Sequence, residues 1–543
     1  MQRRDFLRNA AVAGAGALVA PRLALHAAAP RYLALHPFVE ANPGAVFIMR
    51  TDVGSKVDTA AKLEAGRTFA SRVFSASDTA GVPFSHALAV KPNLTCTFGT
   101  GGTADGMGIR TDVAFTEGVL ETIIGLGYPS SNVWMREGAW AGDGYCPDER
   151  LVGDSVAMAG RLGVHLLDFA SGRTIDQMIF DSLEEGTEVI WKDVPDGVVF
   201  RRLGFSAPFN ADASWTLNIA KMKSHSMGLT LAVKNLQGTV VSPLVRFCEG
   251  IDATAGHLAT VRAHFHDDLE SRIAPLYERH RAEGYVRWDR PGRGPTGGFG
   301  METWAQRTCD AHSVTGEGLH VVEAIYSRNG NGFVKGPGDG DTPQEFLSNM
   351  IIFGRDAFLV DLVAFWIGGQ EPGNFGLFHI ARERGLLDRI NPHTVPLFTW
   401  ESDGPREATL RTIDRVPLLN PYLRRDFEGQ TEAEYHLVDE PYDYGTSGVG
   451  ADGSSDEISL RVVETGGGAI TIECELREAG DVTLELFDAT GRLMLRRDEG
   501  MLPAGRRVLH AGFDAPSGTY FCRVAQRGPR RSLPVTTRFS VRH

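Results

Sequence analysis

The sequence contains little cysteine, with six among 543 residues. No two cysteines lie at the short spacing of an iron-sulfur or structural zinc motif. An iron-sulfur cluster is therefore not expected, and the identity of any cofactor stays unknown. Cys474 and Cys522 lie in strand-like segments near the C-terminus. In an oxidising compartment they could form a disulfide, and two buried free thiols are the alternative.

The chain also lacks an excess of positive charge. It has 55 lysines and arginines against 68 aspartates and glutamates, a formal net charge of −13. Proteins that bind nucleic acids or anionic membranes generally carry a basic surface, so we expect no nucleic-acid partner. Any site for an anion must be a local cluster of donors.

After residue 30 the sequence has no hydrophobic run long enough to span a membrane. Before it, "QRRDFLRN" places Arg3 and Arg4 ahead of the apolar "AAVAGAGALVA" and a small-residue stretch at 27–29. This order resembles a twin-arginine signal peptide over residues 1–30, with a general secretory signal as the alternative. It implies an export machinery as partner and a periplasmic, cell-surface or secreted location.

Residues 31–440 alternate short β-branched runs with longer amphipathic ones. "HALAVKPNLT" and "NVWMREG" are typical of strands, and "FTEGVLETIIGLG" and "SVAMAGRLGV" of helices. This succession predicts an α/β fold with a mainly parallel sheet layered with helices. Ligands of such sheets bind beyond the carboxyl ends of the strands, which directs attention to the polar residues that follow each apolar run.

A different texture follows. Residues 441–457 are rich in Gly, Ser and Asp, which indicates a flexible linker. Residues 458–543 alternate polar and apolar positions between turns, which predicts a small β-sandwich. Its turn residues resemble the C-terminal sorting domain of type IX secretion substrates and the immunoglobulin-like domain of hook-capping proteins; the matching positions are Gly491, Arg492, Gly505, Ser517, Gly518 and Tyr520. That resemblance implies outer-membrane secretion machinery or the cell surface as a partner, without chemistry in the module.

The stretch "LNIAKMKSHSMGLTLAVKNLQG", residues 217–238, concentrates three lysines, a histidine and two asparagines. If the apolar strand continues in extended conformation, Lys221, Lys223 and His225 share one face, because side chains alternate. "GLTLAVKNLQG" is expected to form one or two helical turns that put Thr230 and Lys234 on one face. Cationic side chains beside a helix start can hold an oxyanion. The alternative is solvated lysines with His225 capping a loop.

Other polar residues sit after predicted strands or inside apolar runs. Lys91 and Asn93 are either a second donor pair at the same sheet end or an ordinary turn. Glu137 is either a general base or metal ligand, or an exposed carboxylate. Asp361 lies among valines and leucines, where an unpaired carboxylate is costly, so it should meet a cation or cap a backbone group.

Metal and serine chemistry have weaker support. "HLATVRAHFHDD" offers His257, His264 and His266 beside aspartates, but the spacing favours a solvated helix face. A metal held by His225, Glu137 and a residue of 257–268 remains a lesser hypothesis. The main domain has no Gly-x-Ser-x-Gly turn, so we do not expect a serine hydrolase.

The 217–238 stretch resembles the signature of the domain of unknown function 362 family. "VKPNL", "MREG", "RNGNG" and "GRDAFLVDLVAFWIGG" agree with it in order, over roughly residues 85 to 390. The resemblance implies a domain and a site but no reaction. Many relatives carry a cysteine-rich ferredoxin segment, which this chain lacks. The long polar stretch after the signature is interpreted as an insertion that covers the site.

Together these observations predict an exported protein, an enzyme in the leading hypothesis, that binds an oxyanion-bearing small molecule. Lys223 and His225 are the expected catalytic residues. The expected ligand-binding residues are Lys221, Lys234, Asn235, Lys91, Asn93, Glu137 and Asp361, and none is assigned to a metal. The alternative is a cell-envelope protein that binds the ligand without changing it. Substrate and reaction type stay open.

Overall fold

The computed structural model describes residues 31–94, 108–137, 149–167, 183–241, 264–285, 287–290, 292–294, 297–330, 336, 342–419, 442–444 and 459–541, the last with gaps at 467, 477–478, 489–490, 514 and 528–534. The signal peptide predicted over residues 1–30 and most of the predicted linker lie outside the described residues. Among the residues described, no helix combines the length and apolar character that crossing a bilayer requires.

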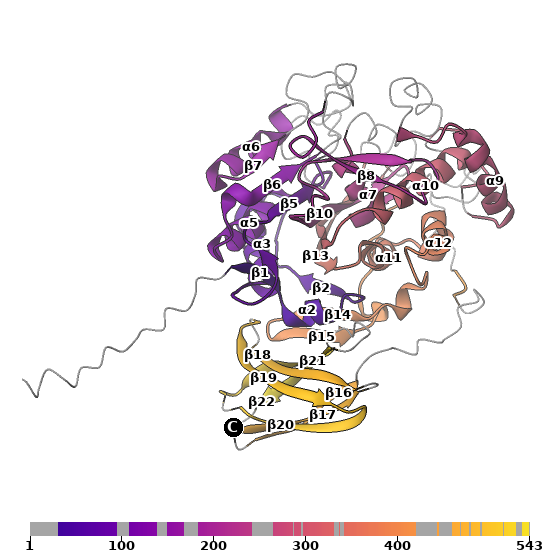
Figure 1. The fold of residues 1–543 in the computed structure, drawn as a ribbon. Coiled ribbons are helices and arrows are strands. Elements are labelled where there is room, and N and C mark those ends of the chain that lie inside the picture. The colour runs from indigo at the N-terminus through magenta and orange to yellow at the C-terminus, as the bar shows by residue number, and fades with distance from the viewer. Residues whose placement is uncertain are drawn as a thin grey trace, which may run out of the picture.

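The centre of the main domain is a mixed sheet of ten strands (Figure 1). Across the sheet the order is β15 (Gly404–Ala408), β14 (Leu397–Glu401), β2 (Val46–Arg50), β13 (Glu345–Gly354), β12 (Gly318–Arg328), β10 (Ser214–His225), β5 (Ala87–Pro92), β6 (Val133–Arg136) and β7 (His165–Leu167), with β11 (Gly228–Thr230) paired to β10. From β12 to β7 every neighbouring pair is parallel. The predicted α/β class with a mainly parallel sheet is confirmed, and β13 is antiparallel to both its neighbours.

Helices cover both faces of this sheet. One face carries α3 (Thr59–Val73), α5 (Val113–Gly125) and α6 (Glu149–Leu162), and the other carries α7 (Ala232–Leu236), α10 (Gly298–Ser313), α11 (Ala357–Ile367) and α12 (Gly376–Glu383). Alternate residues of β10 enter the two layers, with Leu217 in one core and Ala220 in the other. Each large apolar side chain buried here contributes roughly 1.5–3 kcal/mol. The outer helix α9 (Leu269–Ala282) packs against α10.

Local sequence sets the helix starts and their spacing. Asp58, Asp112 and Asp356 cap α3, α5 and α11, each accepting a hydrogen bond from a backbone amide three residues later. Gly66 and Gly118 let α3 and α5 pack closely, because a Cβ on either would come within 2.1 Å of a carbonyl oxygen of the other helix.

Smaller strands and the short helix α2 (Pro37–Ala41) complete the main domain. β1 (Tyr32–Leu35) pairs with β3 (Phe74–Ser77) and β4 (Val82–Pro83), and β8 (Val189–Asp193) pairs with β9 (Arg202–Ser206).

The C-terminal region forms two antiparallel sheets around their own apolar core. One contains β16 (Ser459–Gly466), β17 (Ala469–Leu476) and β20 (Gly505–Gly512), and the other β19 (Leu493–Leu502), β18 (Gly480–Asp488), β21 (Gly518–Arg527) and β22 (Val535–Val541). Cys474 and Cys522 are buried free thiols in this core, so the structure has the second of the two predicted alternatives and not the disulfide.

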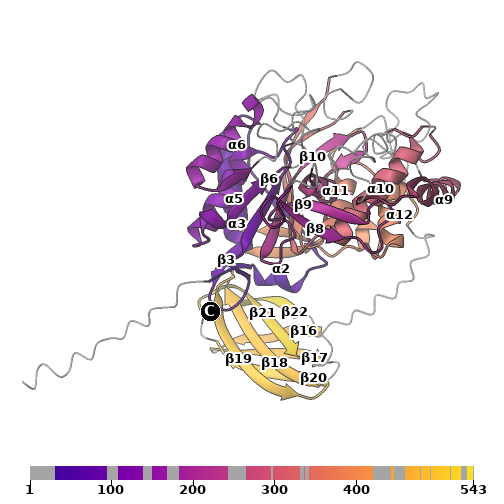
Figure 2. The same ribbon diagram turned by 45° about the horizontal axis from the view of Figure 1, so that its top comes forward.

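The β-sandwich packs directly against the main domain (Figure 2). Helix α2 contacts β21 and β22. The His36 ring lies 4.7 Å from Phe521 and 5.0 Å from Trp400, measured between ring centroids. Within the segment predicted to be a linker, Tyr444 donates a hydrogen bond to Glu371 at 2.9 Å.

Candidate functional site

Most of the predicted site residues lie at the ends of β5, β6 and β10 or on α7, beside β12. The parallel register sets Lys91 opposite Asn218, and Lys221 opposite Glu323. β10 stays extended through His225, as expected, with an irregularity against β12 between Lys221 and Lys223. Lys91, Lys221 and Lys223 are each at most 1% exposed, so solvated lysines are not the explanation of this cluster.

Lys91 and Glu137 form a buried ion pair, with Nζ 2.8 Å from Oε2. The Lys91 amino group also donates to the Pro92 carbonyl at 2.6 Å and to Asn235 Oδ1 at 3.2 Å. Glu137 accepts a second hydrogen bond from the Leu94 amide at 3.0 Å. Burial lowers the pKa of Lys91, and the neighbouring carboxylate opposes that shift. All three amino protons of Lys91 are used inside the protein, which makes it a brace of the site in this conformation.

Gly238, the last residue of the signature, lies against this ion pair. A Cβ there would stand 2.2 Å from Glu137 Oε1 and 2.8 Å from Lys91 Nζ. No side chain fits without moving the pair, so the glycine is needed for close approach.

Lys221 is held by Glu323, whose two oxygens lie 2.9 and 2.8 Å from Nζ. The carboxylate also accepts hydrogen bonds from the amides of Ile325 and Asp112. Both side chains are at most 1% exposed. A buried pair of this kind is stable only when the remaining oxygens are satisfied as well, as they are here.

Asn235 links the strand ends. Its amide nitrogen donates to the Lys91 carbonyl at 3.0 Å and to Asn218 Oδ1 at 2.8 Å, and its oxygen accepts from Asn93 Nδ2 at 3.0 Å. Asn218 in turn contacts His320 Nδ1 at 3.2 Å. Three asparagines therefore connect β5, β10 and α7.

Lys223 has more positively charged neighbours than the other two buried lysines. Its amino group donates to Asn93 Oδ1 at 2.9 Å and to the Ile109 carbonyl. Its pKa is well below the usual lysine value, first because of burial and then because of the charge of Lys234; Glu137 opposes the shift, and Lys221 and Lys91 add smaller lowering contributions.

His225 is half-buried at the end of β10, and its Nδ1 accepts a hydrogen bond from the Met227 amide at 3.1 Å. Its pKa is well below 6.5, because of burial first and then the charges of Lys234, Lys223 and Arg287. The imidazole is therefore neutral at pH 7, whereas we expected a group that titrates near neutrality.

The helix that follows departs from the prediction in two ways. Thr230 belongs to β11, so it does not share a helical face with Lys234, which is half-buried on α7. Asp361 accepts hydrogen bonds from the Ala232 amide at 2.7 Å and the Val233 amide at 2.9 Å. This carboxylate occupies the start of α7, which is consequently not available to an oxyanion. Burial raises the pKa of Asp361 well above its usual value.

Among the described residues, those of the lesser metal hypothesis do not converge on one site. His264 stacks on Trp191 with ring centroids 4.6 Å apart, and His266 contacts the Gly197 carbonyl at 2.9 Å. Glu137 is engaged by Lys91, and His257 lies outside the described residues. Elsewhere in the described part of the chain, His280, Glu283 and Glu383 do converge.

Four residues of the cluster were not predicted from the sequence: Glu323, Asn218, His320 and Gly238. Glu323 carried a signal, because a carboxylate inside the apolar run "HVVEAIYS" must be paired if the strand is buried. Its partner Lys221 lies 102 residues away in the chain, which no local pattern reveals.

Two cavities lie near the sheet, one beside this cluster and one at the opposite end of β10. One of about 300 Å³ is lined by Lys62, Arg110, Thr111, Asp112, Asp154 and other residues of α3, α5 and α6. It adjoins the cluster through Thr111, which donates to the Ile219 carbonyl at 2.6 Å. The other, of about 540 Å³, includes Ser214 at the opposite end of β10. Neither is lined by Lys91, Lys221 or Lys223.

Residues 88–366 match the family described as "Domain of unknown function (DUF362)". The chain belongs to the DUF362 family. The match contains every residue of the lysine cluster, from Lys91 to Asp361. No curated protein matches the chain.

Among solved structures, two crystal structures of Parabacteroides merdae beta-glucuronidase, one with glycerol in its active site, show short similarities at 20% and 19% identity. Each covers 16% of this DUF362 chain and 13% of the glucuronidase, with a TM-score of 0.14. These similarities leave the function of the DUF362 domain open.

Proposed function

We propose that this DUF362 protein is an enzyme that binds an oxyanion-bearing small molecule beside Lys223, His225 and Lys234. The observation that carries the proposal is the charge around the Lys223 amino group. Lys91, Lys221 and Lys234 all lie close enough to lower its pKa, and the carboxylates Glu137 and Glu323 directly bond Lys91 and Lys221. An anionic group placed among these cations would relieve their mutual repulsion.

The lowered pKa values also give the site a chemistry. A lysine whose pKa is depressed keeps a lone pair at a pH where an ordinary lysine is protonated, so it can act as a base or nucleophile. The neutral His225 imidazole can accept a proton beside it. An anion bound here would raise both pKa values, because it stabilises the protonated forms.

The remaining predicted residues then hold the geometry. Lys91 with Glu137 and Lys221 with Glu323 fix the strand ends, Asn93 and Asn235 connect them, and Asp361 anchors α7. Lys234, half-buried on α7, is the cation we expect to move toward a ligand.

The test compares Lys223→Met with the wild type, and uses Lys192→Met, a lysine on the separate β8–β9 pair, as the control. Calorimetric titration with inorganic phosphate, sulfate and acetate should show binding to the wild type and the control. We expect Lys223→Met to lose at least roughly tenfold in affinity, a change of about 1.4 kcal/mol, with an unchanged melting temperature. Equal affinity in all three proteins would reject the proposal.

Turnover separates an enzyme from a protein that only binds. Native protein incubated with a metabolite extract and followed by mass spectrometry should consume an anionic compound, and Lys223→Met should not. A compound that is retained but recovered unchanged would instead indicate the non-catalytic binding protein.

We further propose export by the twin-arginine route, which fractionation of a producing cell would check.

A further inference from the structure

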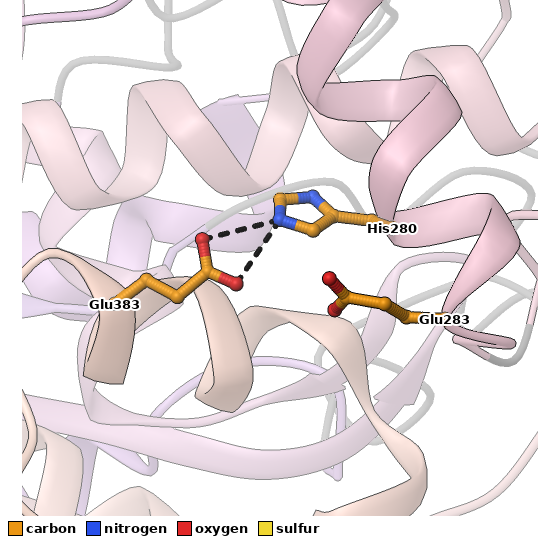
Figure 3. A group of neighbouring side chains, drawn as sticks. All are labelled: His280, Glu283 and Glu383. Carbon is orange, nitrogen blue, oxygen red and sulfur yellow. Dashed lines mark hydrogen bonds and ion pairs between the residues drawn. The ribbon is translucent and has the colours of Figure 1, made fainter.

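A second cluster of ligand-type side chains lies away from the lysines. His280 lies in the last turn of α9, Glu283 directly follows that helix, and Glu383 is the last residue of α12 (Figure 3). One ligand atom from each falls within 4.8 Å of the others. His280 Nε2 is 3.2 Å from both oxygens of Glu383.

The His280 ring is held in place from behind. Its Nδ1 donates to Glu302 Oε2 at 2.7 Å, and both side chains are fully buried. Glu302 also accepts hydrogen bonds from Trp288 Nε1 at 2.6 Å and from Gln306 Nε2 at 2.8 Å. A carboxylate that binds Nδ1 leaves Nε2 directed at Glu383, with Glu283 nearby (Figure 3). Such a carboxylate behind the ring typically supports metal-binding histidines.

We propose that His280, Glu283 and Glu383 bind a divalent transition-metal ion of the Zn²⁺ type, with water completing its coordination. Imidazole and carboxylate are ligands that zinc accepts. Tetrahedral bonds of about 2.0–2.2 Å place neighbouring ligand atoms about 3.4 Å apart. The contact between His280 and Glu383, at 3.2 Å, is close to this spacing, and the exposed Glu283 side chain would have to rotate to complete the site.

In the structure, the guanidinium of Arg279 lies close to the position proposed for the metal ion. Arg279 donates to Glu383 Oε2 at 2.6 Å and approaches His280 Nε2 at 2.9 Å. Half of the Arg279 side chain is exposed. A metal ion would displace this guanidinium, which can turn into solvent without leaving a buried charge unpaired.

The site would fasten α9 to α12. Helix α9 lies in the polar stretch after the signature, and Glu383 lies beyond the DUF362 match at residues 88–366. The ion would therefore join the polar stretch after the signature to a part of the chain outside the family match. This inference is independent of the function proposed for the lysine cluster.

The experiment titrates Zn²⁺ into untagged, chelator-treated full-length protein, by calorimetry with elemental analysis of the product. The variants are Glu283→Gln and Glu383→Gln, both exposed positions. Glu278→Gln is the matched control, because it removes the same charge from the exposed surface of α9. Circular dichroism checks that each variant is folded.

We expect one equivalent of Zn²⁺ in the wild type and the control, and a loss of roughly tenfold or more in affinity in both Gln variants. Co²⁺ in place of Zn²⁺ should give the visible absorption of a tetrahedral site, lost in Glu383→Gln. If the wild type binds no Zn²⁺, or if Glu278→Gln weakens binding as much as the other two, the cluster is an ion network closed by Arg279 and the proposal is wrong.

Discussion

Two sets of lysines in the same cluster are held in different ways. Lys91 and Lys221 each meet a buried carboxylate, at 2.8 Å in both cases. Lys223, two residues beyond Lys221 on the same strand, donates instead to neutral oxygens of Asn93 and Ile109. The difference shows that the partner supplied by the neighbouring segments decides the role of each lysine. A lysine that meets a carboxylate is structural, and one that meets only neutral oxygens can be reactive. The first two lysines hold the strand ends, whereas the pKa of the third is lowered well below its usual value.

Removing a carboxylate from the supporting pairs should have the largest effect. Glu137→Gln leaves Lys91 buried without its counterion, and breaking a buried pair on one side costs about 3–5 kcal/mol of unfolding free energy. Urea denaturation measures the loss. The double variant Lys91→Met with Glu137→Leu should recover much of it, because no charge is left buried. A double variant that is no more stable than Glu137→Gln would show that the pair is not the unit of stability.

A smaller loss should follow from crowding the same pair. Gly238→Ala puts a methyl group 2.2 Å from Glu137 Oε1, and overpacking of this kind typically costs about 1–3 kcal/mol. Gly125→Ala is the control, because a Cβ there meets nothing within 4 Å. Thermal melts of the two variants should differ, with only Gly238→Ala melting lower. Equal melts would mean that the pair moves aside without cost.

The sequence indicated which end of the sheet these polar residues share, but not which partners they have. Lys91, Asn93 and Glu137 lie together, because polar residues at the carboxyl ends of neighbouring parallel strands share one sheet edge, and Asn235 reaches them from α7. The ion pair of Lys221 depends on the pairing of β10 with β12, a non-local contact that local periodicity does not encode.

The role of α7 could not be predicted from the local sequence pattern either. The expected oxyanion site at its start is occupied by Asp361, which is 129 residues away from Ala232. The buried carboxylate itself was predicted to meet a cation or cap a backbone group. Which backbone group it caps follows only from the packing of α11 on α7.

The smallest predicted effect concerns the histidine behind the asparagines. His320 is buried beside Asn218, and burial lowers its pKa to about 3. In the unfolded chain His320 takes up a proton near pH 6.5, whereas in the folded chain it stays neutral until the pH approaches 3. The stability due to neutral His320 is therefore present above pH 6.5 and is lost as the pH falls toward 3.

One proton corresponds to about 1.4 kcal/mol per pH unit in this window. His320→Gln keeps a side chain that can accept from Asn218 but does not titrate. Urea titrations at pH 7 and pH 5 should therefore show a smaller loss of unfolding free energy on acidification in the variant than in the wild type, by up to about 2 kcal/mol. Parallel losses in the two proteins would place the acid sensitivity in other groups and leave the polar chain from His320 to Lys91 without a role in it.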